Sequence, residues 1–136
     1  MTQEEKKLLL KDLCTRLPYG VRVKELEPTK ELELYLTSIY HDTVQVETMT
    51  GGIMACSVEA IKPYLRPMSS MTEEELKEFY MVEGMDTKPI IWNKPQYDWH
   101  FTTNGIDYLL SHHFDFRGLI PMGLALEALD GMYKTE

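Results

Sequence analysis

The sequence predicts an α+β protein with an N-terminal helix, a small antiparallel, barrel-like (SH3-like) sheet and a C-terminal helical part. Residues 19–66 carry a sustained alternation of apolar and polar side chains, which is typical of strands with one buried face. The flanking segments place apolar residues at spacings of three and four, which is typical of helices. We expect residues 1–67 to form the helix and sheet and residues 68–136 to form a helical part packed on them, with one shared core as the alternative.

The first helix is expected from about residue 3 to about residue 16. Thr2 and Glu5 have the spacing of a capping box, in which a hydroxyl and a carboxylate satisfy free amides at a helix start. Pro18 ends this helix. Its apolar stripe, which must dock on another part of the protein, consists of Leu9, Leu10, Leu13, Cys14 and Leu17.

Five short strands follow in the predicted sheet. Alternation places four of them at 21–24, 32–37, 44–47 and 53–58, with turns at 27–30, 40–43 and 50–52. One helical turn at 59–61 precedes a fifth strand at 62–66, which we expect at a sheet edge because Pro63 cannot donate to a ladder. This arrangement predicts a closed SH3-like barrel, with an open curled sheet as the alternative. If the strand around 32–36 is unpaired on one side, a homodimer through that sheet edge is expected.

The C-terminal part is expected to contain two main helices. A second Thr-x-x-Glu spacing, Thr72 with Glu75, opens a helix that ends near residue 83, where Gly84 can cap it. Thr102 or Thr103 caps the next helix, which runs to about residue 113. Residues 114–123 are predicted to form a turn and a short helix, and residues 124–129 a strand or a packed tail. Between the two main helices, residues 86–101 are expected to be irregular, with a strand at 89–92.

The chain is acidic, with 22 Asp and Glu residues against 14 Lys and Arg residues and a formal net charge of -8. This charge repels phosphate backbones and anionic membrane surfaces, so nucleic-acid binding is disfavoured. No apolar run approaches the roughly 18 residues that a membrane span needs, and residues 1–7 lack the apolar core of a signal peptide. We therefore expect a cytoplasmic protein with reduced thiols at Cys14 and Cys56.

Three parts of the chain have distinctive amino-acid sequences. They are residues 1–12, residues 61–75 (IKPYLRPMSSMTEEE), and residues 112–120 (HHFDFRGLI) with 123–128 (GLALEA). They resemble a group of short proteins of unknown activity that gut anaerobic bacteria encode, often in phage-like or mobile regions. The resemblance implies an intracellular bacterial accessory protein of mobile-element origin, and it supplies no functional residues. The chain differs from the group's pattern at Phe116, where a tyrosine is usual, and at Pro121-Met122, where a polar pair is usual.

Most catalytic or metal-binding patterns have a structural explanation. His112 and His113, followed by Asp115, resemble metal ligands, but neighbours on a helix point about 100° apart and no further ligand is spaced to complete a zinc site. Cys56 could pair with His41 or His100 as nucleophile and base, yet it sits in an apolar strand without a glycine-rich elbow, so a buried thiol is the better explanation. The run of residues 73–75, all glutamate, fits the first turn of a helix. No cofactor or metal is predicted.

The aromatic group in the irregular segment is the candidate binding site. Flanked by Lys88 and Lys94, its rings are of the type that concentrates at binding hot spots, although they could instead seal the junction between sheet and helices. The group consists of Trp92, Tyr97, Trp99 and Phe101.

Three function classes remain open. The first is a non-enzymatic interaction or accessory protein that binds another protein through the aromatic group or a sheet edge. The second is a small ligand-binding protein or enzyme with a pocket between sheet and helices and His100, His112 or Asp115 at its mouth. The third is an acidic decoy of nucleic acid, which requires carboxylates along one face from among Glu25, Glu27, Glu31, Glu33 and Glu47.

Overall fold

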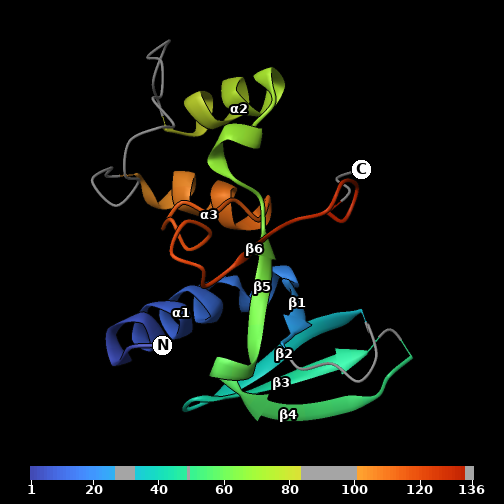
Figure 1. Cartoon of the computed structure of the whole chain (residues 1–136). Helices are drawn as coiled ribbons and strands as arrows, with labels where there is room; N and C mark the ends of the chain where they lie inside the picture. Colours follow the sequence, from blue (N-terminus) through green and yellow to red (C-terminus); the bar gives the residue numbers. More distant parts are fainter. Residues whose placement is uncertain (27–32, 49, 84–100, 134–136) are drawn as a thin grey trace.

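The computed structural model describes residues 1–26, 33–48, 50–83 and 101–133, and it has the mixed α+β class that the sequence predicts (Figure 1). Helices α2 (Glu73–Glu83) and α3 (Thr103–Ser111) pack together at one end of the molecule, and a meander of three strands forms the other end. The turn expected at 27–30, the cap at Gly84 and the strand expected at 89–92 lie outside the described residues. No helix in the described part is both long enough and apolar enough to cross a membrane.

Helix α1 (Gln3–Arg16) begins and ends where the sequence predicts. Its capping box is complete, because the Glu5 amide donates to Thr2 Oγ1 at 3.0 Å and the Thr2 amide donates to Glu5 Oε1 at 2.9 Å. The buried face differs from the expected stripe: Cys14 is exposed. The fully buried positions are instead Leu9, Asp12, Leu13 and Arg16.

The sheet has six strands in the order β4-β3-β2-β1-β5-β6. All neighbours are antiparallel except β5 and β6, which are parallel. A short 3₁₀ turn, Val58–Ala60, precedes β5 as expected. The strands are β1 (Arg22–Glu25), β2 (Leu34–Tyr40), β3 (Thr43–Thr48), β4 (Ile53–Ser57), β5 (Ile61–Leu65) and β6 (Leu126–Glu127).

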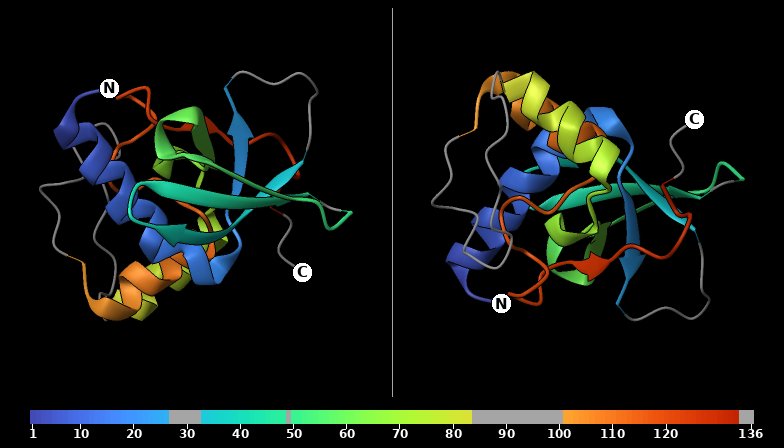
Figure 2. Two further views of the ribbon diagram at one scale, coloured as in Figure 1. Left: turned by 90° about the horizontal axis from the view of Figure 1, so that it is seen from below. Right: turned by 90° about the horizontal axis from the view of Figure 1, so that it is seen from above.

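The sheet is open, with β4 and β6 at its two ends, so the closed SH3-like barrel is not confirmed. It is nevertheless strongly curled, since β1 crosses the direction of β3 and β4 steeply (Figure 2). Strand β2 lies between β1 and β3, so the described part of the segment considered for a free edge, Leu34 to Leu36, is not at an edge. The edge position expected for the strand with Pro63 is also wrong: β5 lies between β1 and β6. Proline is accommodated because β6 pairs only with Tyr64 and Leu65, beyond Pro63.

Two apolar clusters fill the described part of the chain. The first packs α1 onto the sheet and includes Leu119, Leu124 and Ala125 from the C-terminal chain. The second lies between α2 and α3 and centres on Phe79, Leu109 and Phe114. The Thr72 hydroxyl and the Thr102 hydroxyl each accept an amide at the start of these two helices, as the sequence predicts.

The end of α3 turns the chain back toward the sheet. The Phe114 amide donates to the Leu109 carbonyl at 2.9 Å and the His113 amide to the Leu110 carbonyl at 3.0 Å, with His113 in the left-handed region at φ 64°. This is a Schellman motif with histidine where glycine is usual. The short helix expected within 114–123 is not observed. There the Asp115 carboxylate accepts the amides of Leu119 and Ile120 at 2.8 and 2.9 Å and holds a turn instead.

Candidate functional site

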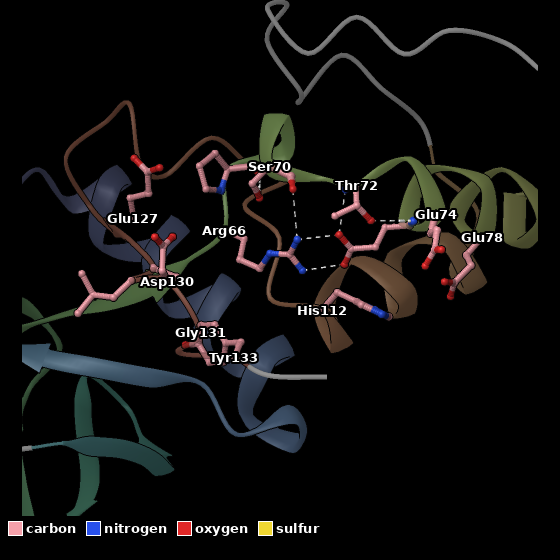
Figure 3. A pocket seen from close by; sticks show the side chains of 14 residues that line it. Arg66, Ser70, Thr72, Glu74, Glu78, His112, Glu127, Asp130, Gly131 and Tyr133 are labelled. Atoms are coloured by element: carbon pink, nitrogen blue, oxygen red, sulfur yellow. Dashed lines mark hydrogen bonds and ion pairs between the residues drawn. The ribbon is translucent and has the colours of Figure 1, made fainter. Parts of the chain in front are cut away.

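A hollow of about 790 Å³ opens between the end of β5, the start of α2, the end of α3 and the chain after β6 (Figure 3). We call it the acidic hollow. It contains Arg66 and His112 together with five carboxylates, Glu74, Glu75, Glu78, Glu127 and Asp130. Its walls come from segments about 60 residues apart along the chain, and the parallel pairing of β6 with β5 brings them together.

Arg66 and Glu75 form a two-pronged ion pair at the centre of the hollow, with both nitrogen–oxygen distances 2.8 Å. The Arg66 guanidinium also stacks on the Phe114 ring, 4.2 Å from its centre. The hydrogen bonds from Arg66, helped by the amide of Thr72, hold the pKa of Glu75 at about 2 despite its partial burial. The pair neutralises itself and fixes the start of α2 against the end of β5.

Four other carboxylates in the hollow make no hydrogen bond or ion pair with any residue of the described ranges. Glu74 and Glu78 project from one face of α2, and Glu127 and Asp130 project from the C-terminal chain on the opposite side of Arg66 (Figure 3). All four side chains are exposed. Within the described ranges, the hollow is therefore a concave surface whose carboxylates on two sides have no cationic partner.

His112 lines the hollow as the residue that caps the end of α3 (Figure 3). Its Nδ1 lies 3.0 Å from the Tyr108 carbonyl, and its ring stacks on the Tyr108 ring with centroids 4.1 Å apart. A carbonyl only accepts, so Nδ1 carries a proton, and in the neutral ring Nε2 is the acceptor. Of the three residues predicted at the mouth of a pocket, the structure brings His112 to this hollow and leaves Asp115 out of it, and His100 lies outside the described residues.

The C-terminal wall is fixed by Tyr133. The Tyr133 hydroxyl donates to the Tyr64 carbonyl at 2.7 Å and accepts the Arg22 amide at 2.8 Å, while its ring stacks on His113 at 3.7 Å. Burial raises the pKa of Tyr133 to about 12. Between β6 and Tyr133, Leu129 lines the hollow with 64% of its surface exposed, so the wall offers an apolar side chain beside the carboxylates.

A buried ion cluster between α1 and the turn after α3 was not predicted from the sequence. Asp12 and Arg16, both fully buried, are joined by a 2.6 Å contact between Oδ2 and Nε. Arg117 Nη1 reaches the other Asp12 oxygen at 2.6 Å, and Arg16 Nη2 donates to the Phe114 carbonyl at 2.8 Å. The cluster ties α1 to the turn after α3, and its burial makes it structural.

The predicted aromatic site is only partly described. Trp92, Tyr97 and Trp99, with Lys88 and Lys94, lie outside the described residues. Phe101 is half-buried and packs edge-on against Phe79, with ring centroids 5.5 Å apart, so it belongs to the second apolar cluster.

The other sequence candidates are dispersed. Cys56 is half-buried in β4, and burial, then the charge of Glu25, raises the pKa of its thiol, which opposes nucleophilic use. His113 stacks on Tyr133, and the Asp115 carboxylate is occupied by two amides. Among the described residues no three His, Cys, Asp or Glu side chains are grouped to hold a metal ion.

The residues of the acidic hollow carry a weak sequence signal. The glutamates at 73–75 do fan around α2: Glu74 lines the hollow, Glu75 binds Arg66, and Glu73 lines no part of it. The sequence does not predict that Glu127 and Asp130 lie near these glutamates, because a parallel strand of two residues has no recognisable sequence pattern.

The chain matches no protein-family model, no curated protein and no solved structure.

Proposed function

We propose that this chain is a non-enzymatic accessory protein that binds another protein by receiving a basic segment in the acidic hollow. The observation that carries the proposal is the set of four carboxylates without partners in the described chain, on two sides of one concave surface. Glu74 and Glu78 can contact a cationic side chain from one side, and Glu127 and Asp130 from the other.

A protein segment suits this surface better than a simple cation. Leu129 is an exposed apolar contact on the same wall, and Arg66 and Glu75 satisfy each other and leave the floor neutral. Each exposed ion pair contributes about 0.2–1 kcal/mol to the free energy of binding. Stable binding therefore requires several carboxylates together with an apolar contact. Such binding is salt-dependent and fast, because like-signed charges in a concave site steer an oppositely charged partner.

The direct test is titration of a fluorescent peptide of alternating lysine and leucine, followed by anisotropy at low salt. Reversing two hollow charges, Glu78→Lys with Asp130→Lys, should weaken binding at least about tenfold, the effect of about 1.4 kcal/mol. The matched control, Glu4→Lys with Asp107→Lys, changes net charge equally at exposed positions outside the hollow and should retain nearly full affinity. Equal losses in both variants, or no binding by the unmodified chain, would overturn the proposal.

A small organic polycation is the second candidate ligand, and the position of His112 favours it. In the neutral ring, its Nε2 can accept a hydrogen bond from an ammonium group bound in the hollow. Calorimetric titration with spermidine separates the candidates. Binding that is lost in His112→Phe supports the polycation, whereas peptide binding that survives in the same variant supports a protein partner.

The nucleic-acid decoy is not part of the proposal. Glu25 shares its side of the sheet with the buried Val23, whereas Glu47 lies opposite Tyr35 on the other side. These two carboxylates do not form the single row that a decoy requires. Glu27 and Glu31 lie outside the described residues.

Two finer expectations belong to the proposal. An intracellular, reducing location is supported by the free thiols of Cys14 and Cys56, and a mobile-element origin rests on the sequence resemblance alone. An SH3-like origin of the curled sheet is supported by the strand order β4-β3-β2-β1-β5 and by the 3₁₀ turn at Val58–Ala60. An experimental structure tests this last point, since barrel closure requires the outer edge of β4 to be paired.

A further inference from the structure

The C-terminal wall of the acidic hollow, residues 126–133, is attached to the rest of the described chain mainly at β6 and at Tyr133. Strand β6 pairs with two residues of β5, Tyr64 and Leu65, and the Ala128 amide donates to the Leu65 carbonyl at 2.7 Å. Tyr133 is attached through its hydroxyl and its ring. No residue of the wall belongs to either apolar cluster. The wall can therefore detach while both clusters stay packed.

His113 is the side chain on which the Tyr133 ring lies. The two rings are stacked, with centroids 3.7 Å apart and planes 17° apart. The His113 backbone is fixed, because its carbonyl accepts the Arg66 amide at 2.7 Å. Its side chain is only 8% exposed, and its Nδ1 has no hydrogen-bond partner among the described residues. A protonated ring donates from both nitrogens, so protonation in place would bury an N–H group without an acceptor.

The charged groups that face His113 also oppose a positive charge on its ring. Arg16 of α1, Arg66 at the end of β5 and the preceding His112 all act in this direction, and burial acts more strongly still. Together they lower the pKa of His113 to about 4. The π face of Tyr133 attracts a cation, but an imidazolium that leaves the site gains hydration and moves away from both guanidinium groups.

The two carboxylates of this region do not compensate for that charge. Asp12 is shared between Arg16 and Arg117, so this cluster of one carboxylate and two guanidinium groups keeps a net positive charge. The Asp115 carboxylate accepts two backbone amides of its own turn. The surroundings of His113 therefore suit a neutral ring.

We propose that His113 is a pH-sensitive switch for the C-terminal wall. When its ring takes up a proton it leaves the buried site, Tyr133 loses the surface on which it is stacked, and residues 126–133 detach from β5. The wall carries Glu127 and Asp130, so its detachment separates the two acidic sides of the hollow. Release of a bound basic segment on mild acidification follows from this switch and rests on the function proposed above; the detachment itself does not.

The test is hydrogen exchange of the full chain, measured by NMR as protection factors, which correct for the intrinsic pH dependence of exchange. The reporter is the Arg22 amide, which donates to the Tyr133 hydroxyl at 2.8 Å. A ring with a pKa of 6.5 when free and about 4 when buried favours detachment about 20-fold more at pH 5 than at pH 7, so protection should fall by that factor. The Leu36 amide, which donates to the Val21 carbonyl within the sheet, should stay far better protected at both pH values.

Two asparagine variants assign the effect to His113. His113→Asn keeps a residue that tolerates the left-handed φ of 64° and does not titrate, so Arg22 should show no such fall. The matched control is His41→Asn, the same change at an exposed histidine with φ 57°, and it should keep the full effect. A fall retained in folded His113→Asn, or equal protection of Arg22 and Leu36 at both pH values, would overturn the proposal.

The unmodified chain supplies a second measurement that needs no variant. In an NMR titration, the imidazole signals of His113 should move over the same pH range in which Arg22 loses protection. A His113 ring that takes up its proton while Arg22 stays protected would overturn the proposal.

Affinity for the lysine–leucine peptide connects the switch to the hollow. The unmodified chain should lose more affinity between pH 7 and pH 5 than His113→Asn, because any loss of charge on the hollow carboxylates weakens both proteins alike. Equal losses would overturn the coupling between the switch and the ligand. If the peptide does not bind at pH 7, the proposed function fails, and exchange at Arg22 still decides whether the switch exists.

Discussion

Arg66 and Glu75 face each other in a two-pronged ion pair, and both nitrogen–oxygen distances are 2.8 Å. The pair joins the end of the sheet to the first turn of α2, where Glu75 also completes a capping box with Thr72. One carboxylate thus serves both the local helix start and a tertiary contact. This double use positions one wall of the acidic hollow.

Glu75→Gln should destabilise the fold at neutral pH. The variant loses the charge on two charge-assisted hydrogen bonds in a partly exposed site, so we expect a loss of about 1–2 kcal/mol in the free energy of unfolding. The folded-state pKa of Glu75 is about 2, below its ordinary value of 4.5. Its contribution is therefore complete above about pH 4.5 and is lost as the pH falls toward 2.

Urea unfolding of both proteins at pH 7 and pH 3 measures this contribution. The stability difference should be smaller at pH 3. Glu74→Gln is the matched control, because the Glu74 carboxylate, next to Glu75 in the sequence, has no partner in the described chain. This variant should change the free energy of unfolding by less than about 0.5 kcal/mol. A difference that stays constant with pH would show that the Glu75 charge does not contribute.

Asp12→Ala should be the most destabilising single change in the buried ion cluster. It leaves the guanidinium of Arg16, which is fully buried, and that of Arg117 without their shared carboxylate. Removing one partner of a buried pair costs about 3–5 kcal/mol. Asp107→Ala, at an exposed position, is the control for loss of an acidic side chain. Equal denaturation midpoints for the two variants would contradict a structural role for the cluster.

His113 should make stability depend on pH between about 6.5 and 4. Burial, then the charges of Arg16, His112 and Arg66, lowers the pKa of His113 to about 4 in the folded chain, from an ordinary 6.5. As pH falls through this range the unfolded chain binds a proton that the folded chain does not, so stability decreases. At about 1.4 kcal/mol per pKa unit, the loss in the free energy of unfolding is at most about 3.5 kcal/mol.

The comparison variant is His113→Asn, because asparagine tolerates the left-handed φ of 64° and does not titrate. Thermal unfolding of both proteins from pH 7 to pH 4 should show a steeper decline for the unmodified chain. Parallel declines would mean that His113 is already free to take up a proton in the folded state.

Tyr133→Phe should loosen the C-terminal wall of the hollow without unfolding the sheet. The variant removes the hydroxyl that accepts the Arg22 amide and donates to the Tyr64 carbonyl, a loss of about 1–3 kcal/mol. Hydrogen exchange read at the Arg22 amide should be faster in the variant. Tyr40→Phe, at a tyrosine that is 74% exposed, should leave that amide unchanged. Unaltered exchange at Arg22 in Tyr133→Phe would show that the hydroxyl does not protect it.

Local signals in the sequence predicted the helix starts and most of the strands, because each depends on residues close together in the chain. The pair Thr2 with Glu5 is an example: its geometry is fixed by a spacing of three. The predicted stripe of α1 contained the buried Leu9 and Leu13 but left out Asp12 and Arg16, because it was drawn from apolar residues alone. Their positions three residues after Leu9 and Leu13 place them on the same face, which is the signal that could have found them.

The site depended on information that no local pattern contains. Glu127 and Asp130 reach the hollow only because β6 adds to β5 in parallel, across about 60 residues of chain. Arg66 was read as the end of a strand, and its pairing with Glu75 required the turn between them to be known. The candidate aromatic group Trp92, Tyr97 and Trp99 stays a prediction.

The most direct measurement of the central claim is two-dimensional ¹H–¹⁵N NMR of the labelled chain during addition of the lysine–leucine peptide. A basic segment bound in the acidic hollow predicts shifts at the amides of Glu78, His112, Leu129 and Gly131, which line it from three segments, and their reversal on raising salt. The amides of Glu4 and Asp107 should not move. Shifts spread evenly over acidic positions, or confined to the β4 edge, would contradict the account.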